Sequence, residues 1–171
     1  PSDAPFLLQT KTCKNACLAA LGVEIIIHIN FNKTLQELSP ETFVEEVLVK
    51  AFSVTHLFAG SDFAFGKSRA GSMESLAQMG KDFGLAVHPI AILKDTAQMA
   101  VSSSRIRAAL QAGQIGLAAD MLGRQPTVSG PISMGDQRGR LLDFPPANLE
   151  LGGCLEPAFG VDAVTAELEW A

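Results

Sequence analysis

Short apolar runs alternate with amphipathic helical patterns over the first two-thirds of the chain, and this alternation limits the possible folds more than any other feature. The run Ile25–Ile29 is rich in β-branched residues and predicts a strand buried on both faces. Further strands are predicted at residues 54–59 and 85–92, and helices at residues 11–21, 39–51, 73–83, 103–111 and 116–122. Where a helix connects two successive strands of one sheet, the strands are parallel and the crossover is right-handed. The pattern therefore predicts an α/β fold, a Rossmann-like parallel sheet with flanking helices.

Local signals place the ends of two of these helices. Ser39 is suited to an N-cap and Pro40 to the first helical position, and Gly84 is suited to a helix stop. Helical periodicity then predicts which side chains face the core. They are Phe43, Val44, Val47, Leu48 and Ala51 in the first helix and Leu76, Met79 and Phe83 in the second.

The composition changes after Leu122, where residues 123–126 are typical of a linker. Residues 127–134 are strand-like, and residues 164–170 alternate apolar and polar side chains as a half-buried strand does. We therefore expect one domain at residues 1–122 and a second, β-rich part at residues 123–171. Because fewer than about 50 residues of β structure seldom close a domain, we expect this part to be incomplete. Its open strand edges favour self-association.

Charge, hydropathy and cysteine content indicate which ligands and which cellular compartment suit this chain. The net charge is −5, which argues against nucleic-acid binding, and no apolar run is long enough for a membrane helix. The three cysteines have no disulfide-like spacing, which favours a reducing cytoplasm. Arginines and lysines cluster in Gly- and Ser-rich stretches, a pattern that favours small anionic ligands.

Two stretches lie where parallel sheets bind ligands, beyond the carboxyl ends of predicted strands. In the first, Ser102, Ser103 and Ser104 open a helix that also carries Arg105 and Arg107. Free N–H groups at a helix start, with hydroxyls and a guanidinium, form an anion site. The alternative is an ordinary serine N-cap followed by solvated arginines. Arg105 and Arg107 lie ~200° apart around a helix, so only one can point directly into such a site.

The second stretch is the loop Gly60–Gly71, which contains glycines, aromatic rings and cations. Phe63 and Phe65 are candidates to flank a planar ring, with Asp62 accepting hydrogen bonds from it. The alternative is a packed loop whose phenylalanines complete the core. The glycines match no phosphate-binding consensus and are weak evidence by themselves.

A third stretch, residues 130–149, belongs to the β-rich part. Gly135 and Asp136, followed by Gly139 and Arg140, predict a tight turn that offers backbone donors and a cation to phosphates, and Asn148 is a neutral oxygen ligand for magnesium. Turn chemistry between two strands is the alternative. The histidines, His28, His56 and His88, have no ligand-like spacing and are expected to be structural.

In their order and spacing these stretches resemble the bacterial bifunctional riboflavin kinase/FAD synthetase family, and the match covers nearly the whole chain. The loop Gly60–Gly71 is similar to the family's flavin-binding loop, with Gly60, Asp62, Phe63, Phe65, Gly66 and Arg69 as implied flavin-binding residues. Ser102 to Arg107 resembles the family's ATP-contacting element. Residues 122–163 resemble the start of its riboflavin kinase module.

The resemblance implies a nucleotidyltransferase domain of Rossmann-like fold followed by an incomplete β-barrel-type kinase module. It also implies two activities: phosphorylation of riboflavin by ATP to FMN, and adenylyl transfer from ATP to FMN, giving FAD and pyrophosphate. The implied partners are thus flavins and adenine nucleotides, and Mg²⁺ is the implied cofactor. Gly135, Asp136, Gly139 and Arg140 would contact phosphates in the kinase module, and Asn148 would bind magnesium.

The sequence departs from the family pattern in several places. The family's opening strand and its H-x-G-H element are not found, so a partial chain is expected. Pro146 stands where a threonine ligand of magnesium is usual, and Asp143 and Asp162 replace a glycine and a tyrosine. We therefore expect impaired activity of this chain alone. The alternatives are a non-catalytic flavin- or nucleotide-binding remnant and, less favoured, a nucleotidyltransferase with another acceptor.

Overall fold

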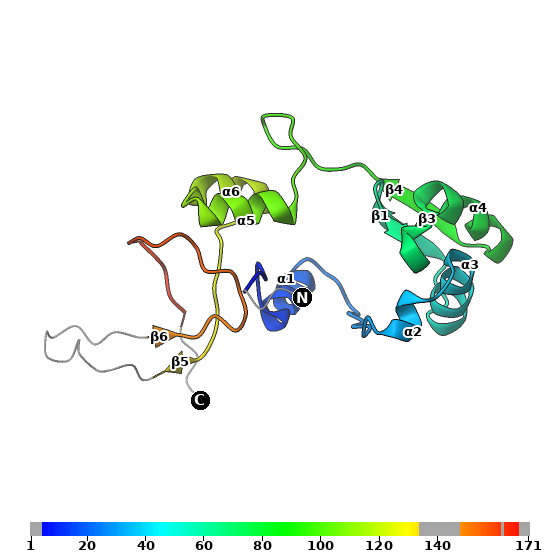
Figure 1. The fold of residues 1–171 in the computed structure, drawn as a ribbon, viewed down its shortest axis with the longest axis horizontal. Helices are drawn as coiled ribbons and strands as arrows, with labels where there is room; N and C mark the ends of the chain where they lie inside the picture. The colour runs from blue at the N-terminus through cyan, green and yellow to red at the C-terminus, as the bar shows by residue number, and fades with distance from the viewer. Residues whose placement is uncertain (1–4, 134–147, 162, 168–171) are drawn as a thin grey trace, which may run out of the picture. The chain divides into compact units, whose positions relative to one another are not determined.

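The computed structural model describes residues 5–133, 148–161 and 163–167, and the chain divides into two compact units (Figure 1). One unit comprises Ile27–Ala100, and the other comprises Pro1–Ile26 together with Val101–Ala171. This division follows compactness and does not coincide with the predicted boundary after Leu122. That boundary separates an α/β part from a β-rich part of the sequence, and it stays a prediction.

A two-stranded parallel sheet lies at the centre of the unit Ile27–Ala100. Strand β1 (His56–Gly60) pairs with β4 (Ala86–Ile90), and helix α4 (Met73–Phe83) lies between them in the sequence. This arrangement confirms the predicted parallel pairing across a helical connection. Leu57 and Val87 lie opposite each other and pack against the helices. Helix α4 and the helical segment at residues 40–51 therefore cover one face of the sheet.

The helix that starts at Ser39 has two parts. A short α-helical turn, α3 (Pro40–Thr42), continues into a π-helix, η1 (Phe43–Ala51). The Ser39 hydroxyl accepts a hydrogen bond from Thr42 N at 3.2 Å, which confirms the predicted N-cap. Val44 and Leu48 are buried as predicted. A π-helix turns less per residue than an α-helix, so the α-helical period used for the prediction does not hold as far as Ala51, which is exposed.

Helix α4 occupies the predicted residues because both of its ends are set locally. Ser72 and Ser75 form a reciprocal capping box, and Gly84 ends the helix in the left-handed conformation with φ 67°. Leu76 and Val44 are fully buried at the centre of the core of this unit. Phe83 was predicted to face inward but is 40% exposed, because it is the last residue before the chain turns at Gly84.

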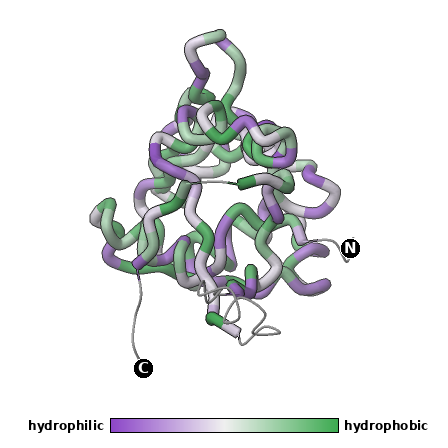
Figure 2. Tube along the Cα trace, turned by 90° about the vertical axis from the view of Figure 1, so that its left-hand side faces the viewer, coloured by the Kyte–Doolittle hydropathy of each residue, from purple (hydrophilic) through white to green (hydrophobic). Residues whose placement is uncertain are grey.

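The second unit is built mainly from helices, namely α1 (Lys11–Ala20), α5 (Ser103–Gln111) and α6 (Ile115–Leu122). All three match predicted helices to within one or two residues. Its core combines α5 and α6 with a residue from the far end of the chain: Ile106, Ala109, Leu110, Ala118, Met121 and Leu155. Figure 2 shows that hydrophobic and hydrophilic residues alternate along the coiled segments of the chain.

The remaining elements are short: α2 (Lys33–Gln36), β2 (Ala64–Phe65), η2 (Lys67–Arg69), β3 (Gly71–Ser72), β5 (Ile132–Ser133) and β6 (Asn148–Leu149). β2 pairs with β3, and β5 with β6, both antiparallel. In the predicted β-rich part, the described residues form only the β5–β6 pair. The predicted β-barrel of the kinase module is therefore not confirmed. Within those residues no helix is long and apolar enough to cross a membrane.

One predicted strand is not formed, and a second is described only in part. Ile25, Ile27 and Ile29 are 77%, 56% and 50% exposed, and their segment has no regular structure. A strand needs hydrogen bonds from a neighbouring strand, and β1 and β4 pair only with each other in the described chain. Residues 164–167 are likewise irregular and exposed, and the rest of that predicted strand lies outside the described residues.

Candidate functional site

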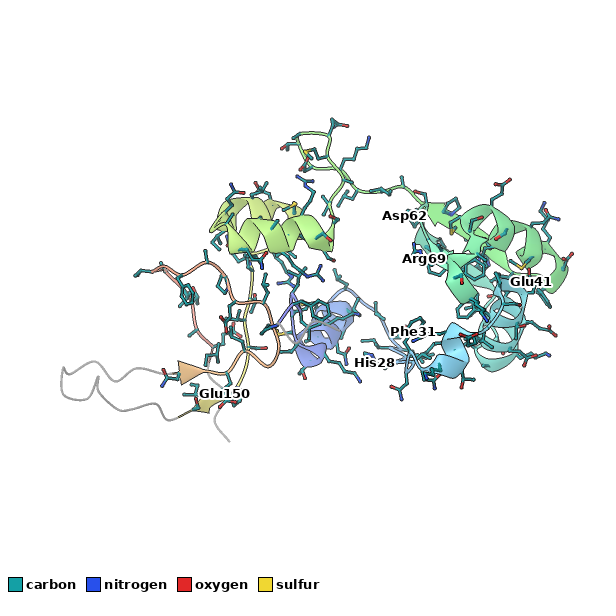
Figure 3. The ribbon with its side chains drawn as sticks, in the orientation of Figure 1. His28, Phe31, Glu41, Asp62, Arg69 and Glu150 are labelled. Atoms are coloured by element: carbon teal, nitrogen blue, oxygen red, sulfur yellow. The ribbon has the colours of Figure 1, made fainter. Side chains whose placement is uncertain are left out.

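The loop Gly60–Gly71 starts where both parallel strands end. Ser61 N donates to Ile90 O and Phe63 N donates to Gly60 O, each at 2.9 Å, which makes a tight turn at the carboxyl edge of the sheet. This is the edge at which parallel sheets bind ligands. Asp62, at the tip of this turn, is exposed to solvent (Figure 3). The predicted position of the loop relative to the sheet is thus confirmed.

The second half of the loop is held against the segment before α3. Gly66 has φ 72°, and a Cβ there would lie 2.8 Å from Pro40 N, so this close approach requires glycine. Lys67 N donates to Leu38 O at 2.7 Å, and the Lys67 ammonium pairs with Glu37. No local sequence pattern predicts the Lys67–Glu37 ion pair, because its two side chains are 30 positions apart.

The two phenylalanines of the loop lie against each other. The rings of Phe63 and Phe65 are stacked with centroids 5.6 Å apart and planes at 12°. Phe65 also contacts Phe43 at 5.7 Å and is 6% exposed, so it belongs to the core. In this structure the two rings are therefore stacked on each other with no gap for a planar ligand between them, and the flavin-binding roles of Phe63 and Phe65 stay predictions. Phe63 remains 36% exposed.

Arg69 lies two residues before Gly71, near the C-terminal end of the loop. Ser68 and Arg69 have φ values of 55° and 58°, and Arg69 N donates to Gly66 O at 3.0 Å. Left-handed backbone is uncommon for residues other than glycine and persists where the surroundings determine it. The loop thus presents an exposed carboxylate at Asp62 and an exposed guanidinium at Arg69 (Figure 3). It also presents the partly exposed ring of Phe63.

The serine-rich stretch forms the start of α5 in the other unit. Ser102 is the N-cap, and its hydroxyl accepts from Arg105 N at 3.3 Å. Ser103 and Ser104 are exposed in the first turn, while Ile106 is buried in the core. The predicted helix start is confirmed, and the anion site at this start stays a prediction.

Arg107 is engaged with the segment before α1. Its Nε donates to Phe6 O at 2.7 Å, and its guanidinium carbon lies 5.4 Å from the centre of the Phe6 ring. Part of this side chain thus anchors the chain near residue 6 to helix α5. Arg105 is half buried two positions earlier on the same helix.

Most residues predicted for the kinase module cannot be placed. Gly135, Asp136, Gly139, Arg140 and Pro146 lie outside the described residues. Asn148 begins β6, opposite Ser133, and is exposed. In the parts of the chain with described positions, no group of three or more His, Cys, Asp or Glu side chains is placed to hold a metal.

Two family models match the chain. The FAD synthetase model matches residues 1–105, which include the loop Gly60–Gly71 and the start of α5. The riboflavin kinase model matches residues 122–170. The two matches occur in the order expected from the sequence motifs.

Curated relatives are named for both activities, riboflavin kinase and FMN adenylyltransferase. The bifunctional riboflavin kinase/FMN adenylyltransferase of Buchnera aphidicola subsp. Schizaphis graminum is 32% identical over 95% of this chain and 52% of its own length. The protein of the same name from Listeria monocytogenes is 37% identical over 86% of this chain and 46% of its own length. The chain spans about half the length of the curated relatives it matches.

A solved structure is also similar to this chain. It is described as a macrolide-efflux protein from Streptococcus pneumoniae and has a TM-score of 0.78 and 28% identity, over 91% of this chain and 50% of that one. The FAD synthetase model alone matches more than half of the 171 residues, and a riboflavin kinase match follows it. The chain therefore belongs to the FAD synthetase family.

Proposed function

We propose that this chain binds FMN and ATP for adenylyl transfer, the reaction that gives FAD and pyrophosphate, and that its C-terminal part belongs to a kinase module that makes FMN from riboflavin and ATP. The observation that carries the proposal is the ordered loop at the carboxyl edge of β1, within the stretch matched by the FAD synthetase model. The curated relatives named for both activities support it.

The flavin would lie on the loop Gly60–Gly71. Asp62 accepts hydrogen bonds from the ring system, Phe63 offers its exposed face for stacking, and Arg69 pairs with the phosphate of FMN. Phe65 supports Phe63 from the core side. The absence of a side chain at Gly66 lets the backbone approach Pro40 closely, and the absence of one at Gly60 leaves room for the Asp62 carboxylate.

ATP would bind at the start of α5 through Ser102, Ser103, Ser104, Arg105 and Arg107. Adenylyl transfer depends chiefly on positioning two phosphates and stabilising the charge that develops between them. Exposed hydroxyls and N–H groups at a helix start suit that task. Arg107 supports it with the part of its guanidinium that does not contact Phe6.

The domain division follows from the same proposal. Residues 1–122 form the adenylyltransferase part, and residues 123–171 form the first part of the kinase module, with Gly135, Asp136, Gly139 and Arg140 at phosphates. Asn148 would be a magnesium ligand there. We place the protein in a reducing cytoplasm on account of its free cysteines.

A second candidate function is binding without catalysis. Pro146 stands at the position of a usual magnesium ligand and has no side-chain oxygen, and Asp143 and Asp162 add charge nearby in the sequence. These substitutions favour a kinase part that has lost its reaction.

One titration separates the candidates. The purified chain is titrated into FMN, with and without ATP and magnesium, while flavin fluorescence is followed, and FAD is then sought by chromatography. FAD formation supports adenylyl transfer, and binding without FAD supports the second candidate. No fluorescence change at high micromolar protein would exclude both. Asp62→Asn should weaken FMN binding, whereas Asp82→Asn, an exposed aspartate on α4, should not.

A further inference from the structure

Two histidines from neighbouring strands meet on the sheet of the unit Ile27–Ala100. His56 Nδ1 lies 3.1 Å from His88 Nε2, and the two rings are nearly parallel, with planes at 13° and centroids 5.4 Å apart. His56 is exposed and His88 is half buried. A hydrogen bond between two imidazoles is one explanation of this contact, and a shared ligand is another.

The sheet determines why these rings meet. Phe58 lies directly opposite His88 in the parallel register, and His56 lies two positions earlier, so all three side chains are on one face. The helices cover the other face through Leu57 and Val87. The ring of His88 stacks on Phe58, with centroids 4.5 Å apart and planes at 15°, which restricts its orientation.

We propose that His56 and His88 form a two-nitrogen site for a divalent transition-metal ion. Imidazole nitrogens bind zinc at about 2.0–2.1 Å, so two of them at neighbouring positions of a tetrahedral or octahedral ion are separated by about 2.9–3.4 Å. The observed 3.1 Å lies in this interval. The two nitrogens are therefore already spaced for one ion.

Both nitrogens must offer a lone pair to the metal, which requires one tautomeric change. In the hydrogen-bonded pair one of the two nitrogens carries a proton. When His56 Nδ1 is the donor, this proton moves through water to His56 Nε2, and His88 keeps its proton on Nδ1. Each ring stays neutral and two nitrogen–metal bonds form, so protons and charge balance without release of a proton.

The ligand type selects the metal. Imidazole suits zinc, copper and nickel ions, whereas magnesium prefers oxygen ligands. With no third His, Cys, Asp or Glu grouped beside them among the described residues, the other positions belong to water, and the affinity should rise from Zn²⁺ to Cu²⁺. His56 is four residues before Gly60, or about 13 Å along a strand. The site is therefore separate from the proposed flavin loop.

The test uses ¹⁵N-labelled full chain and Zn²⁺, followed in long-range ¹H–¹⁵N spectra of the imidazole rings. The chain has three histidines, so three rings are observed. We expect His56 Nδ1 and His88 Nε2 to shift together to saturation at one Zn²⁺ per chain, while His28 remains unchanged. Replacing His56 or His88 with Gln should weaken binding by at least about tenfold. His28→Gln is the matched control and should leave it unchanged.

Three outcomes would overturn the site: parallel weak shifts of all three rings, zinc binding at the cysteines with unchanged His56 and His88 signals, or wild-type affinity in the Gln variants. Backbone amide spectra of each variant verify that β1 and β4 remain folded. Because Zn²⁺ binding is read without flavin or ATP, the result does not depend on the proposed enzymatic function.

Discussion

The ring of Phe65 fills the space that a side chain at residue 71 would need: a Cβ at Gly71 would lie 2.7 Å from Phe65 Cε1 and Cζ. The two residues are paired across β2 and β3, at the point where the loop Gly60–Gly71 closes on itself. Because Phe65 also contacts Phe43 and Phe63, this pair connects the closure of the loop to the core beneath it.

Gly71→Ala should therefore move Phe65 and loosen the loop. Overpacking of this kind costs about 1–3 kcal/mol, so the urea midpoint should fall and FMN binding should weaken. Gly116→Ala is the control, because Gly116 lies within α6 with open space around it. Alanine there favours the helix by about 0.5–1 kcal/mol, so an equal loss in both variants would contradict the packing argument.

Leu76→Ala should be strongly destabilising, because Leu76 is fully buried between the helices and the sheet. Truncation of a buried leucine costs about 2–5 kcal/mol through lost burial and the cavity that remains. Leu93→Ala, in the same unit but 70% exposed, should change stability by less than about 0.5 kcal/mol. Urea unfolding of both variants checks the difference, and similar midpoints would refute the assigned core.

Arg107→Ala should weaken ATP binding more than FMN binding. It also removes the hydrogen bond to Phe6 O and the contact with the Phe6 ring, at a cost to stability of about 1–2 kcal/mol. Phe6→Leu separates the two effects, because it keeps the backbone carbonyl and loses only the ring. If Phe6→Leu reduces ATP binding as much as Arg107→Ala does, Arg107 acts through the fold and not at the phosphates.

Alkaline conditions should destabilise the unit that contains Cys154. Burial raises the pKa of the Cys154 thiol, and the nearby Cys13 thiol acts in the same direction. Since the folded-state pKa lies above the unfolded one, the contribution is fully present below the unfolded value of about 8.5 and is lost as pH rises through the folded value. Unfolding midpoints should fall above that pH in the native chain but much less in Cys154→Ala. Identical pH profiles would count against this assignment.

The helices were predictable because their signals are local. Ser72 and Gly84 determine the ends of α4, and Ser102 begins α5 where the sequence indicates. Parallel pairing of β1 and β4 followed from the helix between them. The position of the loop at the carboxyl edge of the sheet followed from the same reasoning.

Long-range contacts were not predictable in the same way. Ile25–Ile29 has the composition of a buried strand, yet it is exposed, since a strand depends on a partner that its own sequence cannot supply. Similarly, the spacing of Phe63 and Phe65 allowed a ligand between them, and only the contact with Phe43 decided that Phe65 belongs to the core.

By itself the sequence determined the family, the order of its motifs and the ends of most helices, because these depend on residues close together in the chain. The tertiary structure decided that Arg107 contacts Phe6, that Lys67 pairs with Glu37, and that His56 meets His88. Each of these contacts joins residues at least 30 positions apart. Their geometry follows from strand register and helix packing, which no local pattern specifies.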